Sequence, residues 1–168
     1  MKTDLISRTW EETLLSELFC TNKEIQEALL SKKVSIHLCV FQEPYLSYIL
    51  EGRKTVESRF SINKCAPVGR VESGDILLLK KASGPVVAMC SVDHVWTYIL
   101  DTPTFNTIRK EFSRSLCAED PSFWDARKDA KFATLMRIKN VVEISPIHCG
   151  KRDRRGWVVL GPRIKHHV

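Results

Sequence analysis

The spacing of apolar residues divides the chain into a helical N-terminal part and a strand-rich remainder. Two helices are predicted before residue 34, because Thr-x-x-Glu, the form of a capping box, stands at 9–12 and again at 21–24. Apolar residues follow each box at helical spacing: Leu14, Leu15 and Leu18 after the first, and Ile25, Ala28 and Leu29 after the second. We therefore expect residues 1–33 to form a helical extension packed on a main domain of residues 34–168.

From residue 34 the apolar period changes to two. Val34, Ile36, Leu38 and Val40 alternate with other residue types, which predicts a half-buried strand. His37 lies on the opposite face of this strand, so we expect its ring to point outward or into a cleft.

The rest of the chain alternates short strands with a few helices. Pro44 suits the first turn of a helix, and Gly52 is placed to end it. Turn, capping and periodicity signals predict the remaining elements: strands at 55–60, 76–81 and 86–96, helices at 102–116 and 120–130, and strands at 133–145 and 156–160. Since strands dominate without a regular strand-helix-strand repeat, we predict an α+β fold: a small mixed β-barrel with flanking helices.

Composition is that of an ordinary soluble globular protein. The 168 residues are 43% hydrophobic and 27% charged, and no segment approaches the roughly 20 apolar residues of a membrane span. The N-terminus mixes acids and bases, unlike a secretory signal, so we expect a cytoplasmic monomer with no membrane contact. The six cysteines are scattered without a metal-binding spacing, so we expect reduced thiols, no metal and no cofactor.

The excess positive charge is concentrated at the C-terminal end. Residues 137–168 hold eight Lys or Arg but two Asp or Glu, out of a net charge of +6. The densest run, residues 151–157, places Arg154 and Arg155 beside Trp157, a combination suited to phosphate and base contacts. The alternative is a solvated basic tail that keeps the protein soluble.

A second charged cluster stands where the helix after Pro44 ends and a strand begins. Residues two apart on a strand share a face, so Thr55, Glu57 and Arg59 would point one way, with Val56, Ser58 and Phe60 toward the core. Lys54 sits at the junction and can reach the same place. The cluster is either a set of surface ion pairs or the lining of a cleft.

The stretch FQEPYLSYILEGRKTVESRF, residues 41–60, resembles the signature of the ASCH domain family. The matching positions are Gln42, Pro44, Tyr45, Ile49, Gly52, Lys54, Thr55, Glu57 and Arg59. The resemblance extends over about residues 36–160 and implies a PUA-like barrel with a cleft between the Tyr45 helix and the 55–60 strand. It also implies an RNA or nucleotide-like ligand. Lys54 and Arg59 would meet a phosphate or base edge, Glu57 would accept hydrogen bonds, Tyr45 would stack, and Gln42 and Thr55 would add contacts.

The same resemblance implies an enzymatic alternative. Some ASCH proteins are amidohydrolases that deacetylate N4-acetylcytidine with a Lys and a Thr in a related block; here Lys54 matches their Lys, but Glu57 stands in place of their Thr. Glu57 could act as a general base for water. A ribonuclease would use Lys54 and Tyr45. The catalytic candidates are thus Lys54 and Glu57, and a third hypothesis is protein binding by the helices of residues 1–33.

Overall fold

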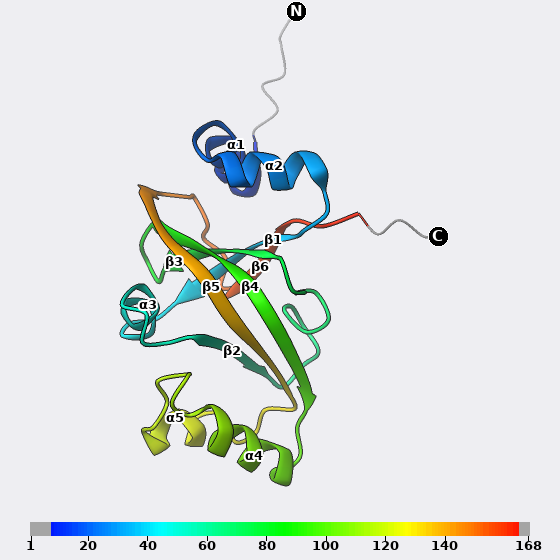
Figure 1. Cartoon of the computed structure of the whole chain (residues 1–168), viewed down its shortest axis with the longest axis vertical. Helices are drawn as coiled ribbons and strands as arrows, with labels where there is room; N and C mark the ends of the chain where they lie inside the picture. The colour runs from blue at the N-terminus through cyan, green and yellow to red at the C-terminus, as the bar shows by residue number, and fades with distance from the viewer. Residues whose placement is uncertain (1–7, 165–168) are drawn as a thin grey trace, which may run out of the picture.

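The computed structural model describes residues 8–164, which form a mixed β-sheet with helices at both ends (Figure 1). Within these residues the sheet has six strands: β1 (Ile36–Phe41), β2 (Val56–Ser61), β3 (Ile76–Lys81), β4 (Val86–Ile99), β5 (Phe132–Ile147) and β6 (Trp157–Gly161). The same part of the chain contains five helices: α1 (Trp10–Thr21), α2 (Lys23–Ser31), α3 (Tyr45–Leu50), α4 (Thr102–Phe112) and α5 (Pro121–Asp125). The predicted α+β class with a mixed sheet and flanking helices is confirmed.

The strands follow the order β2-β5-β4-β3-β1-β6. β1 and β3 run parallel, and the other neighbours run antiparallel, including the predicted hairpin of β3 and β4. The β4–β5 pair is the longest, and its register shifts at several points. Such bulges bend and twist strands, which helps a sheet of this size curl into a half-barrel.

The curled sheet is bridged across its opening by one side chain. Arg59, on the edge strand β2, donates from Nη2 to the Val40 carbonyl at 3.0 Å and from Nη1 to the Gly156 carbonyl at 3.3 Å. Val40 is in β1 and Gly156 directly precedes β6, so a single guanidinium links the two ends of the strand order. In a closed barrel the first and last strands of the order would be joined by backbone hydrogen bonds; here the Arg59 side chain makes the connection instead.

The N-terminal helices confirm one predicted capping box and correct the other. At α1 the Glu12 N–H donates to the Thr9 hydroxyl at 3.2 Å, and the Glu12 carboxylate accepts from the Thr9 N–H at 3.0 Å. Thr21 instead ends α1, and Asn22 caps α2 by accepting from the Ile25 N–H at 3.0 Å. An Asn one residue later was the better cap, because its amide oxygen reaches the N3 position directly.

Helices α4 and α5 are shorter than predicted. α4 ends at Phe112, and the chain then turns, with Cys117 in the left-handed region at φ 52°. This turn buries Leu116 and Ala118, and the Ala118 carbonyl accepts from the indole Nε1–H of Trp124 at 2.7 Å. Burial of these side chains under the sheet outweighs the local helical propensity. No helix within residues 8–164 is long and apolar enough to cross a bilayer.

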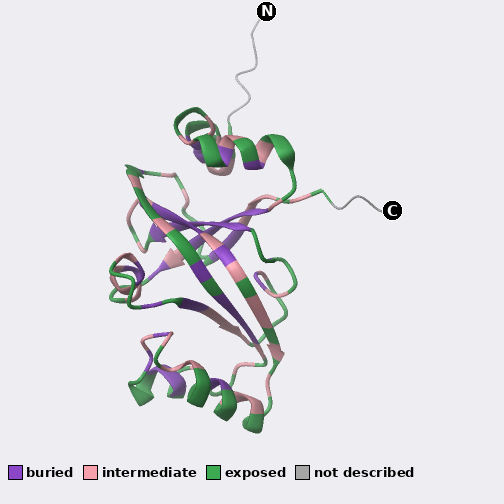
Figure 2. Cartoon of the chain, in the orientation of Figure 1, coloured by how far each residue is buried: buried purple, intermediate pink, exposed green. Residues whose placement is uncertain are grey.

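Figure 2 shows buried residues along the strands and on the sides of the helices that face the sheet. Their apolar side chains pack in three clusters. Leu14, Leu18 and Ile25 of α1 and α2 pack on the outer face of β1 and β3. A second cluster fills the concave side of the sheet, and a third lies beneath α4 and α5. Burying a Leu or Ile side chain contributes about 1.5–3 kcal/mol, so the N-terminal helices are firmly attached to the sheet.

A buried polar network joins β1, β3 and β6. Trp157 Nε1–H donates to His37 Nδ1 at 3.1 Å, and His37 Nε2 lies 3.0 Å from an Asp75 carboxylate oxygen that also binds Arg163. Because Nδ1 accepts, the proton is on Nε2 and is donated to Asp75. The prediction for His37 is therefore wrong: its ring is fully buried, and it is fixed by the polar groups on either side of it.

Candidate functional site

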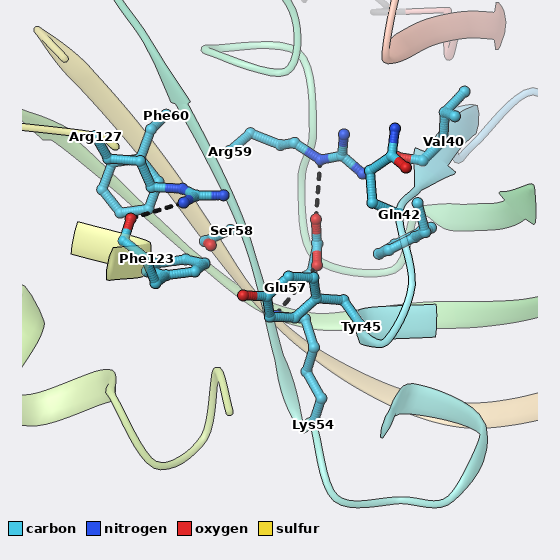
Figure 3. Close-up of a pocket in the computed structure, with 11 residues that line it drawn as sticks. Val40, Gln42, Tyr45, Lys54, Glu57, Ser58, Arg59, Phe60, Phe123 and Arg127 are labelled. Carbon is cyan, nitrogen blue, oxygen red and sulfur yellow. Dashed lines mark hydrogen bonds and ion pairs between the residues drawn. The ribbon is translucent and has the colours of Figure 1, made fainter. Parts of the chain in front are cut away.

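A cavity of about 350 Å³ lies at the opening of the half-barrel, between β2 and the end of β1. Tyr45 of α3 lies on one side of it, and Phe123 of α5 and Arg127 lie on the other (Figure 3). We call this space the binding cavity. It brings together five of the residues predicted to contact a ligand: Gln42, Tyr45, Lys54, Glu57 and Arg59.

Glu57 is the centre of the charged cluster. Its carboxylate lies 3.4 Å from Lys54 Nζ and 2.9 Å from Arg59 Nε, so two cations hold the two oxygens (Figure 3). Lys54 is 3% exposed and Glu57 is 4% exposed. A set of surface ion pairs would be largely solvated, so this alternative is excluded by the burial of both partners. The strand face that carries Glu57 lines the cavity.

Lys54 is committed to the protein as well as to Glu57. Its ammonium donates to the Val56 carbonyl at 2.8 Å and to the Leu116 carbonyl at 3.4 Å, and it lies 5.7 Å from the centre of the Tyr45 ring. Burial lowers the pKa of Lys54, while the neighbouring Glu57 carboxylate opposes this shift. With its three protons directed at these groups, Lys54 positions the carboxylate.

Arg59 has a similar positioning role. Two of its nitrogens bind the carbonyls that close the half-barrel, and its guanidinium lies 5.1 Å from the Phe41 ring and 5.4 Å from the Trp157 ring. Its Nε is buried close to Glu57 but is not aligned for a hydrogen bond, so the contact is an ion pair. The geometry therefore assigns Lys54 and Arg59 to holding Glu57, in contrast to the expected phosphate contacts.

Six residues of the binding cavity were missed by sequence reasoning: Val40, Phe41, Ser58, Phe60, Phe123 and Arg127. The Arg127 guanidinium stacks at 3.6 Å from the centre of the Phe123 ring, and its Nη1 donates to the Phe123 carbonyl at 2.7 Å. Burial lowers the pKa of Arg127, which nevertheless remains a cation. Within residues 8–164 it forms no ion pair with a carboxylate, so it is the cavity cation with charge to offer a ligand.

The backbone edge of β2 also faces the cavity. β2 is an edge strand, and the Val56 N–H and carbonyl point away from β5, toward Ser115 and Lys54. Peptide groups alternate in direction along an antiparallel strand, so those of Ser58 and Phe60 point to the same open edge. Residues 57–60 all line the cavity. Among residues 8–164 the Ser58 N–H and carbonyl have no hydrogen-bond partner, so both are available to a ligand.

The other predicted residues lie outside the cavity. Thr55 is exposed, and its N–H donates to the Ser115 carbonyl at 3.0 Å. Trp157 is 6% exposed, so the prediction of an open stacking ring is wrong: the indole is committed to His37 and to the core. The basic run that precedes Trp157 was expected at the surface. Trp157 itself is buried because it is the first residue of β6.

Arg154 and Arg155 lie on an exposed loop of residues 151–156, which we call the basic loop. Arg155 pairs with Asp153 at 3.0 Å and with Glu11 of α1 at 3.2 Å, so much of its charge is neutralised. The loop ends at Gly156, whose carbonyl is bound by Arg59. The basic loop thus borders the far side of the opening without lining the cavity.

Metal-ligand side chains are not gathered at this site or elsewhere in the described chain. No group of three or more His, Cys, Asp or Glu residues within residues 8–164 is arranged to hold a metal ion. The carboxylate at the centre of the cavity is already paired with two cations.

Comparison with known proteins places the fold. No protein-family model matches the sequence, and no curated protein matches it. Among solved structures, the ASCH protein of Zymomonas mobilis matches with a TM-score of 0.58 at 14% identity, over 74% of this chain and 86% of that one. A single-substitution variant of the same protein matches with a TM-score of 0.52 at 17% identity, over 67% of this chain and 74% of that one. The half-barrel described above therefore has the α+β fold of these ASCH structures.

Proposed function

We propose that this protein binds RNA, or a ligand built like one of its nucleotides, in the binding cavity. The observation that carries the proposal is a buried carboxylate, Glu57, held between two cations at the wall of a cavity with aromatic sides. Such a cavity, of about 350 Å³, is within the range of small-ligand sites and offers stacking surfaces together with a few fixed polar groups. Single-stranded RNA is recognised by this combination.

Each group of the cavity has a role in this proposal. Glu57 accepts a hydrogen bond from an exocyclic amine or ring N–H of the base, and the Ser58 peptide provides one donor and one acceptor. Tyr45, which is partly exposed, offers a ring face to the base, and stacking is worth about 1–3 kcal/mol per base. Arg127 meets the phosphate. The cavity has three cations and one carboxylate among its lining residues, which favours an anionic ligand.

The basic loop would extend this surface along the strand. Arg154 is exposed, and Arg155 would exchange its present carboxylate partners for phosphate oxygens. Phosphate contacts of this kind add affinity without reading sequence. The solvated-tail alternative stays open, and the salt dependence of binding distinguishes the two.

The direct test is Glu57→Gln, which keeps the size of the side chain and removes its charge. RNA affinity should fall about tenfold or more, since a hydrogen bond to a charged group is worth about 1.5–3 kcal/mol. Fluorescence anisotropy with short labelled RNAs measures this, and Glu143→Gln, at an exposed position on β5, is the matched control. RNA affinity equal in the wild type and Glu57→Gln, or no binding by the wild type, would refute the proposal.

A second candidate is a hydrolase acting on a modified nucleoside or on RNA. It is favoured by the lowered pKa of buried Lys54 beside Glu57, because perturbed titratable pairs in a cavity often mark catalytic sites. Glu57 would take a proton from water. Incubation with N4-acetylcytidine or RNA should then give product with the wild type, and Glu57→Gln should lose turnover while still retaining ligand. If the substrates are chemically unchanged after long incubation, hydrolysis is ruled out and ligand binding remains as the proposed function.

Protein capture by the N-terminal helices has less support. The apolar residues that would form the capturing face, Leu14, Leu18 and Ile25, are each no more than 1% exposed and pack against the sheet. A partner would have to use the opposite, more polar side of these helices.

A further inference from the structure

We infer that the ligand is an RNA strand of at least two nucleotides, and that a second cavity holds the neighbouring nucleotide. This inference rests on the proposed function of the binding cavity and names its ligand class. The second cavity, of about 450 Å³, lies between the segment after β2 and the segment after α5. Each cavity suits one nucleotide, and the two are adjacent.

The two cavities share a wall. Phe60 and Arg127 line both of them, so a strand leaving the binding cavity on this side enters the second one directly. The Phe60 ring packs edge-on against Phe123 at 6.3 Å between centres, and the Arg127 guanidinium lies 3.6 Å from the centre of the Phe123 ring. The wall is therefore rigid, with a cation on it.

The position of Arg127 fits the phosphate that would join two nucleotides. A linking phosphate has to cross the wall between the two bases, and Arg127 is the one residue of this wall that carries charge. A planar guanidinium can donate to two phosphate oxygens at once. Asp129 also lines the second cavity, but the two segments that flank it, residues 61–65 and 126–131, carry four Lys or Arg against this one Asp, so the local potential is positive.

The second cavity also offers an apolar surface next to the C-terminal end of β2. Ile62, directly after β2, is 64% exposed and lines this cavity. A single exposed apolar side chain is common on a protein surface, but Ile62 also forms part of a cavity wall on which a base can pack. The Lys131 N–H donates to the Ser61 carbonyl at 2.8 Å, which fixes the two flanking segments to one another. Ile62 is therefore presented on a fixed backbone, where it can support a base.

The test compares ligands of increasing length on the intact protein. Calorimetric titration of nucleoside 5′-monophosphates and the matching 5′-phosphorylated dinucleotides should show the dinucleotides binding about tenfold tighter, the gain expected from one further stacked base. Dinucleotides that lack one base separate the phosphate contact from the base contact, and they should recover only part of the gain.

Ile62→Asp supplies the second arm. It should remove most of the gain from the second nucleotide and leave mononucleotide affinity within about twofold, because Ile62 does not line the binding cavity. Val142→Asp, at a similarly exposed apolar residue on β5, is the control. Equal affinity of mononucleotides and dinucleotides would overturn this inference and leave the proposed function standing. Binding of neither would overturn both.

Discussion

At the scale of single residues, the local signature was enough to find the charged part of the site. Lys54, Glu57 and Arg59 are five residues apart at most, and strand geometry places them together. Phe123 and Arg127 lie more than 60 residues further along the chain, in a segment without a distinctive pattern. Only the tertiary fold brings them to the cavity, so no sequence signal could have selected them.

Sequence reasoning also misassigned the roles of the two cations next to Glu57. Charge alone suggested that Lys54 and Arg59 meet a phosphate. Their donors are instead occupied by the carbonyls of Val56, Leu116, Val40 and Gly156, because a buried cation needs such partners. Depth of burial decides the role, and depth depends on elements distant in sequence.

Lys54→Met tests the buried ion pair. The change removes one of the two cations at Glu57 and leaves buried carbonyls without a donor, so the free energy of unfolding should fall by about 3–5 kcal/mol. Urea denaturation followed by circular dichroism measures the loss. The double variant Lys54→Met, Glu57→Leu should be more stable than Lys54→Met alone, since the buried carboxylate that had lost one of its two cations is gone and Arg59 keeps its two carbonyl partners. If Lys54→Met is as stable as the wild type, the Lys54–Glu57 ion pair is solvated and does not stabilise the fold.

Ser58→Pro tests the role of the β2 backbone in ligand binding. Proline removes the peptide N–H that points to the open edge and costs no ladder hydrogen bond there. Ligand affinity should fall about fivefold, the worth of one hydrogen bond. Ser58→Ala retains this N–H and should bind more tightly than Ser58→Pro. Thermal melts confirm that both variants fold, and equal affinity of the two would show that the peptide group does not contact the ligand.

At the scale of elements, periodicity located each strand, while ends and lengths were less accurate. β1 and the β3–β4 hairpin lie where alternation and turns placed them. α4 and α5 end early, because burial of Leu116, Phe123 and Trp124 under the sheet requires the chain to turn. Tertiary packing outweighs helical propensity in such short segments. The capping residue Asn22 was missed because a Thr-x-x-Glu pattern stood one residue earlier.

Asp75 links three elements and should make their association sensitive to acid. Burial acts to raise the pKa of Asp75, but hydrogen bonds from His37 and Arg163 outweigh it and lower the pKa below the ordinary value. A lowered pKa gives stability that is present above about pH 4 and lost as pH falls through the folded value.

The measurement is the free energy of unfolding of the wild type and Asp75→Asn between pH 7 and pH 3. The wild type should lose stability below about pH 4, and Asp75→Asn, already less stable at pH 7, should lose less over the same interval. Asp125→Asn, at the end of α5, is the control. If the free energy of unfolding falls equally with pH in the wild type and in Asp75→Asn, Asp75 is not the source of the acid sensitivity.

At the scale of the whole molecule, the sequence predicted the fold class but not the way the sheet closes. The order of six strands depends on pairings between distant segments, which periodicity does not encode. The Arg59 bridge between the two ends of this order was also out of reach, since the arginine appeared to be a ligand contact. The opening that Arg59 spans is the place where the binding cavity forms.

The asymmetric charge of the molecule leads to a prediction about salt. If the basic loop contacts phosphates, RNA affinity should fall steeply with salt, and Arg154→Ala, Arg155→Ala should reduce the slope of log K against log salt by about one to two. Lys23→Ala, Lys33→Ala removes the same charge from α2 and the bend that follows it, and should leave the slope nearly unchanged. An unchanged slope in the arginine variant would assign the loop to solubility.

The most direct measurement of the central claim is a crystal structure of the protein with a nucleoside 5′-monophosphate at saturating concentration. We expect the base against the ring of Tyr45 in the binding cavity, an N–H of the base within hydrogen-bond distance of Glu57, and the phosphate at Arg127. A nucleotide bound elsewhere on the molecule, with the binding cavity free of ligand, would contradict it.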